Sequence, residues 1–148
     1  MVCSSFRCTG FNIMNESLKN QLIRQEGLRL KPYKCTANKT TIGVGRNLDD
    51  IGISEDEAML LLENDIKKIK EQAEKLPWFL KLNEARQNVV LNMIFNLGIS
   101  GFLKFKETIH YLESGQYDQV AIEMLESKWA DQVGSRAKEL SKIMFDGF

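Results

Sequence analysis

The strongest constraint on the fold is a helical repeat of apolar residues that follows a capping box. Ser54 and Glu57 have the spacing at which each side chain can bond the backbone N–H of the other at the start of a helix. Pro77 ends the pattern. Between them, apolar residues recur at intervals of three and four, at Ala58, Leu62, Ile66, Ile69, Ala73 and Leu76. The sequence therefore predicts a long helix over about 54–76.

The residues after Pro77 carry further helical signals. Asn83 can cap a second helix that Gly98 ends. The apolar face predicted for this helix contains Val89, Val90, Met93, Ile94 and Leu97. Three more helices are expected at about 102–114, 117–129 and 135–145.

The N-terminal third has a different character. A short helix is predicted from Asn15 to Glu26, with Gly27 as its left-handed C-terminal cap. The β-branched, glycine-punctuated stretch 40–45 favours a small antiparallel hairpin or three-stranded sheet over about 28–48. The predicted class is α+β and mostly helical, with a ligand cleft expected between two lobes. The predicted organisation is a flexible extension (1–14) and one domain (15–148), made of an N-lobe (15–53), a linking helix (54–76) and a C-lobe (77–148).

Composition narrows the class of protein. With 148 residues, 43% of them apolar and 27% charged, the chain fits a globular protein of one domain. Three cysteines cannot form a closed disulfide framework, which favours a reducing compartment. No apolar run approaches the roughly 20 residues of a membrane span, and the first residues do not resemble a secretory signal.

Charge is balanced overall but uneven along the chain. The net charge is zero, whereas the segment 27–46 holds five cations and no acid. These cations are Arg29, Lys31, Lys34, Lys39 and Arg46. Such a segment is either a solvated basic hairpin or a surface for an anionic partner, such as a wall polymer or a nucleic acid.

The stretch 26–41 holds a carboxyl, a thiol and a hydroxyl, at Glu26, Cys35 and Thr41, with gaps of eight and five residues. Glu26 is expected at the negative end of a helix dipole, which favours the protonated form that a general acid needs. Cys35 could be a base, a nucleophile or a group that orients water. The more ordinary interpretations are an exposed glutamate, a buried thiol and a strand-forming threonine.

This spacing resembles the catalytic stretch of the phage-type lysozymes, the endolysins that hydrolyse peptidoglycan. Their pattern is Glu, eight residues, Asp or Cys, five residues, Thr, and this chain has its Cys form. The resemblance extends over about 15–147 through three further segments. These are Asp56-Glu57-Ala58, the stretch Leu91 to Gly98, and Lys128-Trp129 with Arg136-Ala137-Lys138.

The resemblance implies cleavage of the β-1,4 bond between N-acetylmuramic acid and N-acetylglucosamine. Glu26 would protonate the leaving oxygen, while Cys35 and Thr41 would position or activate water in an inverting reaction. Gly45, Phe95 and Asn96 match substrate-binding positions, and Arg136 matches an arginine that pairs with the catalytic glutamate. The family pattern also suggests that Arg46 pairs with Asp65.

The same resemblance implies a setting for the protein. We expect a monomer with no cofactor or metal, acting on peptidoglycan glycan strands. It would accumulate in the host bacterial cytoplasm and reach the periplasm through a partner pore, a holin. No nucleic acid or membrane span is expected.

Two other classes of protein remain as alternatives. One is a non-catalytic lysozyme-like module that binds wall glycan or another protein, although such a module has no need of Glu26. The other is a helical nucleic-acid binder, but the basic segment lies on a glycine-rich hairpin rather than on a recognition helix. His110, the only histidine, lies away from the triad, and no further feature supports a Cys35–His110 hydrolase.

Overall fold

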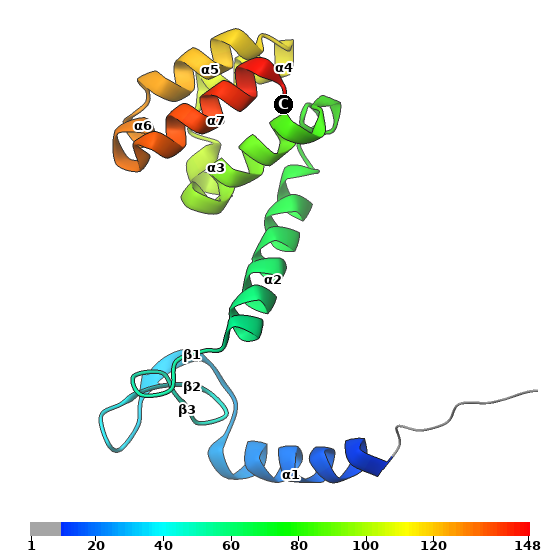
Figure 1. Ribbon diagram of the computed structural model, residues 1–148, viewed down its shortest axis with the longest axis vertical. Coiled ribbons are helices and arrows are strands. Elements are labelled where there is room, and N and C mark those ends of the chain that lie inside the picture. The colour runs from blue at the N-terminus through cyan, green and yellow to red at the C-terminus, as the bar shows by residue number, and fades with distance from the viewer. Residues whose placement is uncertain (1–9) are drawn as a thin grey trace, which may run out of the picture. The chain divides into compact units, whose positions relative to one another are not determined.

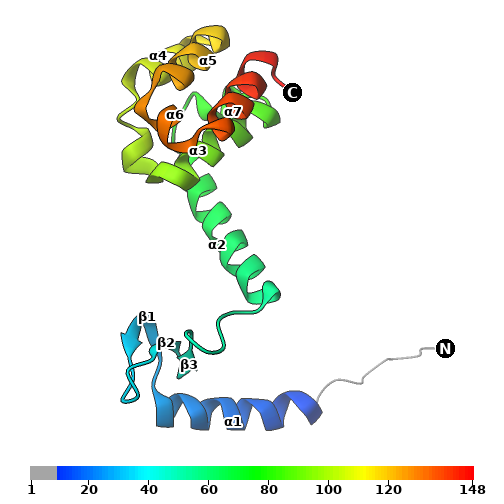
Figure 2. The ribbon, with the colours of Figure 1, turned by 60° about the vertical axis from the view of Figure 1, so that its left-hand side comes forward.

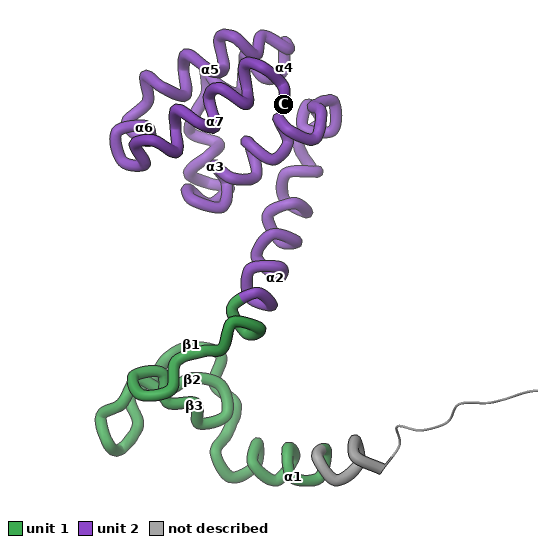
Figure 3. Tube along the Cα trace, in the orientation of Figure 1, with its two compact units in different colours: residues 1–58 green, residues 59–148 purple. Residues whose placement is uncertain are grey.

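The computed structural model describes residues 10–148, and side chains from residue 16 onward. The chain divides after Ala58 into two compact units (Figure 3). Unit 1 is residues 1–58 and unit 2 is residues 59–148. A flexible extension was predicted for residues 1–14, and residues 1–9 of it lie outside the described residues. Helix α1 begins at Gly10 rather than at the predicted Asn15.

Unit 1 contains helix α1, a small sheet and the first turn of helix α2 (Figures 1 and 2). Helix α1 runs Gly10–Glu26. The antiparallel strands are β1 (Arg29–Lys34), β2 (Thr40–Gly43) and β3 (Arg46–Asn47), in the order β1-β2-β3. Gly27 has φ 79°, and its N–H donates to the Ile23 carbonyl at 2.9 Å, so α1 ends at Glu26 as predicted.

Helix α2 (Glu55–Ala73) begins with the predicted capping box. The Ser54 N–H donates to the Glu57 carboxylate at 2.8 Å, and the Glu57 N–H donates to Ser54 Oγ at 3.2 Å. The helix ends three residues before Leu76, whose N–H bonds the Ala73 carbonyl in a final turn before Pro77. The helix and its start are therefore confirmed, with a slightly earlier end.

The remainder of unit 2 is helical. Its elements are the 3-10 turn η1 (Phe79–Lys81) and the helices α3 (Glu84–Phe102), α4 (Lys106–Ser114), α5 (Tyr117–Glu126), α6 (Lys128–Val133) and α7 (Ser135–Asp146). Asn83 caps α3 by accepting the Arg86 N–H, and α3 kinks at Gly98, where the prediction placed its end. The predicted helix 117–129 is two helices, because Ser127 accepts the Ala130 N–H and starts α6.

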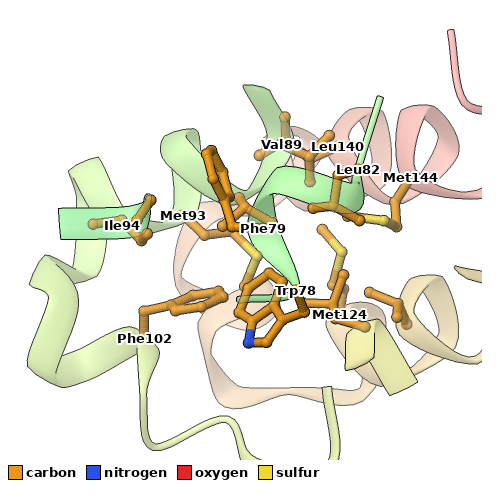
Figure 4. Packing of buried hydrophobic residues seen from close by; sticks show 14 of the residues in the cluster. Trp78, Phe79, Leu82, Val89, Met93, Ile94, Phe102, Met124, Leu140 and Met144 are labelled. Atoms are coloured by element: carbon orange, nitrogen blue, oxygen red, sulfur yellow. The ribbon is translucent and has the colours of Figure 1, made fainter. Parts of the chain in front are cut away.

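The core of unit 2 lies among these helices (Figure 4). Trp78 packs against Phe102 with ring centroids 6.2 Å apart, and against Phe79 in an edge-on arrangement. The five apolar residues predicted for the buried face of α3 all contribute to this core. Four of them are buried, and Leu97 is partly buried and packs against the others. A mostly helical chain with a three-stranded antiparallel sheet near the N-terminus confirms the predicted lysozyme-like α+β class.

Among the described residues, none of the helices is by itself both long and apolar enough to cross a membrane. Helices α3 and α4 meet that criterion of length and composition only as a pair bent by 115°.

Arg86 fastens the C-terminal end of α7 to α3. Its Nε donates to the Met144 carbonyl at 2.8 Å and its Nη2 to the Phe145 carbonyl at 3.1 Å. The guanidinium also lies 3.9 Å from the centre of the Tyr117 ring. One side chain therefore satisfies carbonyls that the end of a helix leaves without partners.

Arg86→Ala should lower the free energy of unfolding by about 2 kcal/mol, because it removes two charge-assisted hydrogen bonds and one cation–π contact. Urea denaturation followed by tryptophan fluorescence measures this change. Lys81→Ala, at an exposed position in the same unit, is the control and should stay within about 0.5 kcal/mol of wild type. Equal stability of the two variants would contradict the fastening role.

Candidate active site

Cys35 and Thr41 lie together in unit 1, where the turn between β1 and β2 begins and ends. The Cys35 N–H donates to the Lys39 carbonyl at 3.0 Å, and the Asn38 N–H donates to the Cys35 carbonyl at 2.8 Å. Asn38 has φ 59°, a left-handed conformation that asparagine tolerates in tight turns. Cys35 is half-buried, whereas Thr41 is buried with 3% of its surface exposed.

The turn creates a favourable site for a thiolate. The backbone N–H groups of Lys39 and Ala37 point at the sulfur and lower the pKa of Cys35, and the Thr41 hydroxyl adds a smaller effect in the same direction. Partial desolvation opposes them but is smaller than the two leading N–H contributions. The shift therefore comes from the local backbone, not from the surrounding cations.

The Thr41 hydroxyl lies near two hydrogen-bond acceptors, the Lys39 carbonyl oxygen and the Cys35 sulfur. Oγ1 lies 3.1 Å from the Lys39 carbonyl oxygen, and it is also in hydrogen-bonding contact with the Cys35 sulfur. Donation to the carbonyl leaves the oxygen lone pairs available, whereas donation to sulfur stabilises a thiolate.

Glu26 lies against the backbone of Gly45. A Cβ atom built on Gly45 would lie 3.1 Å from Glu26 Oε2 and 3.5 Å from its carboxyl carbon. Gly45 also has φ 73°, which side-chain-bearing residues rarely adopt. The Glu26 side chain is exposed, so its carboxyl is open to a ligand on the side away from Gly45.

The segment Thr41–Gly45 therefore contacts both of the other triad residues. Its first residue meets Cys35 and its last meets Glu26. The segment is anchored beside Thr41, where the Thr40 N–H donates to Asp49 Oδ2 at 2.8 Å and lowers the pKa of that carboxyl. Asp49 was not predicted as a supporting residue, and its position six residues after Gly43 gave no signal of this contact.

Arg46 pairs with Glu57 within unit 1. Its Nη2 and Nη1 atoms lie 2.8 and 3.1 Å from the two carboxylate oxygens, and Nη1 also donates to the Gly52 carbonyl at 3.2 Å. This pair lowers the pKa of Glu57 together with the Ser54 N–H, which is the larger cause. Asp65 belongs to unit 2, and its pairing with Arg46 stays a prediction.

The other three predicted site residues belong to unit 2. Arg136 donates from Nε to Asn92 Oδ1 at 2.8 Å, and the Asn96 Oδ1 accepts the Trp129 indole N–H at 2.9 Å. Phe95 is 45% exposed, so it is not a core aromatic within this unit. A groove of about 330 Å³ is lined by Leu62, Ile66, Ile69, Asn88, Leu91, Asn92, Phe95 and Arg136.

Asn92 is the functional neighbour that the sequence analysis did not identify. The only signal was one of two amides, Asn92 and Asn96, in a largely apolar helical stretch. Its side chain holds the Arg136 guanidinium in place. Pairing of Arg136 with Glu26 stays a prediction, as do the roles of Phe95 and Asn96 in binding substrate.

Comparison with known proteins identifies relatives over most of the chain. The family model for phage lysozyme matches residues 23–142. A probable T4-type lysozyme of Dictyostelium discoideum is 28% identical over 164 residues, covering 90% of this chain and 96% of that protein. An endolysin of Acyrthosiphon pisum secondary endosymbiont phage 1 is 29% identical over 114 residues, covering 72% of this chain and 73% of its own length.

A third relative is larger. The pre-baseplate central spike protein Gp5 of Enterobacteria phage T4 is 28% identical over 162 residues, which cover 90% of this chain. This chain spans only 28% of the spike protein. The lysozyme-like sequence thus occurs both in relatives of similar length and as one part of a longer protein.

The fold is that of a lysozyme-like α+β protein. Because the family model covers more than half of the chain, the protein belongs to the phage lysozyme family. Membership supports peptidoglycan hydrolysis as the activity at the level of the family.

The thiolate of Cys35 should form at a lower pH in the folded protein than in the urea-unfolded chain, because the turn N–H groups stabilise it only when folded. Absorbance at 240 nm, measured on protein in which Cys3 and Cys8 are replaced by serine, follows this titration. Thr41→Val should raise the pKa part of the way back, whereas Thr36→Val, at an exposed position in the same turn, should not. Identical titrations in the folded and unfolded states would contradict this assignment.

Proposed function

We propose that this protein is a peptidoglycan hydrolase that cleaves the β-1,4 bond between N-acetylmuramic acid and N-acetylglucosamine. The observation that carries the proposal is the path of Thr41–Gly45, which contacts Cys35 at one end and Glu26 at the other. All three triad residues also fall within the range matched by the family model.

In this mechanism Glu26 is the general acid. Its proton passes to the glycosidic oxygen as the bond to the sugar carbon breaks, so that the leaving sugar departs as an alcohol. The Gly45 backbone limits the positions of the carboxyl because it fills the space on one side. A general acid needs such restriction, since proton transfer requires contact with the leaving oxygen.

Cys35 and Thr41 supply the attacking water. Thr41 orients the water through its oxygen, and the Cys35 thiolate accepts a proton from it as the water oxygen bonds to the sugar carbon. The lowered pKa of Cys35 supports this role, because it increases the fraction of thiolate near neutral pH. Attack from the face opposite the leaving group inverts the configuration at that carbon.

The remaining assignments complete the proposal. Phe95, Asn96 and Gly45 bind the glycan, and Arg136 adds positive charge that balances the carboxylate of Glu26. The protein acts in bacterial lysis after a holin opens the membrane, having accumulated in the host cytoplasm.

Glu26→Gln should slow the clearing of permeabilised Gram-negative cells by about 100-fold or more, because the amide cannot donate the proton. Turbidity measures the rate. Glu16→Gln, an exposed change on the same helix, is the matched control and should clear as wild type does.

Clearing by Glu26→Gln at the wild-type rate would remove the residue from the chemistry and favour a non-catalytic binding module. Mass spectrometry of the released fragments distinguishes the products. Hydrolysis adds one water to each cleaved bond, whereas transglycosylation leaves an anhydro sugar.

Gly45→Ala should reduce clearing by more than about tenfold, since the new methyl group would lie 3.1 Å from Glu26 Oε2 and displace the acid. Gly52→Ala is the control because Gly52 also has a positive φ, at 67°, but its Cβ would meet nothing within 4 Å. Both changes strain the backbone, so a larger loss at Gly45 reflects its place beside Glu26 in the proposed site. Equal loss in the two variants would assign the effect to backbone strain alone.

A further inference from the structure

The five cations of the segment 27–46 fall into two groups in the structure. Three of them have carboxylate partners: Lys34 with Asp49 at 4.0 Å, Lys39 with Asp50 at 2.9 Å and Arg46 with Glu57 at 2.8 Å. Arg29 and Lys31 have no carboxylate within 4.0 Å among the described residues. Within the segment 27–46, the cations without a carboxylate partner therefore both lie on β1.

Arg29 is held in a defined orientation by Tyr33. Its guanidinium lies 4.3 Å from the centre of the Tyr33 ring, which is half-buried and so is itself restrained. Stacking on the ring covers one face of the guanidinium. It leaves the N–H groups at the edge of the guanidinium, which form a fork of parallel donors, free to bind a planar acceptor. Less side-chain entropy is lost when a restrained arginine binds a carboxylate.

The backbone of β1 exposes Lys31 between these two residues. Arg29 pairs with Gly43 and Tyr33 pairs with Thr41, so the register between β1 and β2 shifts. An advance of four residues along β1 corresponds to an advance of two residues along β2. The residues between them leave the regular ladder, and Leu30 is 82% exposed. Pro32 has no N–H, which makes this strand a poor template for an added strand and favours recognition by side chains.

This surface adjoins the candidate active site. Arg29 follows Glu26 by three residues, and Tyr33 pairs with Thr41 in the strand register. A glycan held at the triad would therefore carry its substituents close to β1. In peptidoglycan those substituents include the stem peptides on the muramic acid residues, which bear free carboxylates.

We propose that Arg29, Lys31 and Tyr33 form a binding surface for the stem-peptide carboxylates of peptidoglycan. The proposal rests on the proposed function, because it takes peptidoglycan as the substrate. Arg29 binds a carboxylate through its fork, and Lys31 adds a second cation beside it. This surface would favour peptide-bearing wall over bare glycan.

The number of cations separates this partner from other polyanions. Binding to an anionic lipid surface typically uses clusters of four to eight basic residues, and nucleic-acid binding uses many phosphate contacts. Two unpaired cations beside an aromatic ring match a small planar anion more closely. A carboxylate is such an anion, and the arginine fork has the matching geometry.

The test measures binding in the Glu26→Gln background, so that the wall is not degraded. Purified sacculi are pelleted with the protein, both untreated and after their carboxyls have been coupled to glycinamide. Arg29→Ala/Lys31→Ala should weaken binding to untreated sacculi about tenfold, and it should change binding to blocked sacculi little. Lys81→Ala/Lys104→Ala removes two exposed charges from unit 2 and should stay within about twofold of the parent protein.

Arg29→Lys is a second variant that keeps the positive charge but removes the paired N–H donors of the guanidinium. Its binding to untreated sacculi should fall by less than that of the double variant. The proposal is overturned if the double variant binds untreated sacculi as tightly as the parent protein does. It is also overturned if the double variant's binding to blocked sacculi is weakened by the same factor as its binding to untreated sacculi. Binding to phosphatidylglycerol vesicles in place of sacculi would also overturn it and would indicate a lipid surface. Clearing by protein with Glu26 intact reports hydrolysis separately, so failure of the catalytic proposal is recognised independently of this surface.

Discussion

The geometry of the candidate site depends on the backbone between Thr41 and Gly45. This segment touches the Cys35 sulfur through Thr41 and the Glu26 carboxyl through Gly45. The left-handed conformation of Gly45 and the lack of a Cβ there allow the close approach to Glu26. Among the side chains described in unit 1, Thr41 alone is buried, so the path of this segment does not rest on a large apolar core.

Polar contacts hold that path instead. The Thr40 N–H binds Asp49, and Glu57 binds both Arg46 and the Ser54 N–H. The pKa values of Asp49 and Glu57 are both lowered in the folded protein. A depressed carboxyl pKa contributes stability that is present above the unfolded pKa and is lost as the pH falls through the folded value. Acid should therefore loosen unit 1 through these contacts, whereas the apolar core of unit 2 contains no such group among its buried side chains.

Local signals predicted most of the fold. The capping box at Ser54, the cap at Asn83 and the end of α1 at Gly27 each depend on neighbouring residues, and each was confirmed. The triad spacing also located the segment that brings Cys35 and Thr41 together. The contacts of Arg46 with Glu57 and of Arg136 with Asn92 were not predicted, because they depend on how elements pack rather than on sequence spacing. The break at Ser127 was missed because its cap interrupts an otherwise continuous helical pattern.

The proposed role of Cys35 as a base requires the ionised form of its thiol. A carboxylic acid is ionised at neutral pH without assistance, whereas a thiol needs stabilisation of its anion. The Cys35–Lys39 turn supplies it through two backbone N–H groups, and left-handed Asn38 allows that turn to close. The Thr41 hydroxyl, which donates to the Lys39 carbonyl at 3.1 Å, adds a smaller contribution to the lowered pKa of Cys35. In the proposed mechanism, a thiol that ionises readily in the folded protein suits a base, which accepts a proton from water and later releases it.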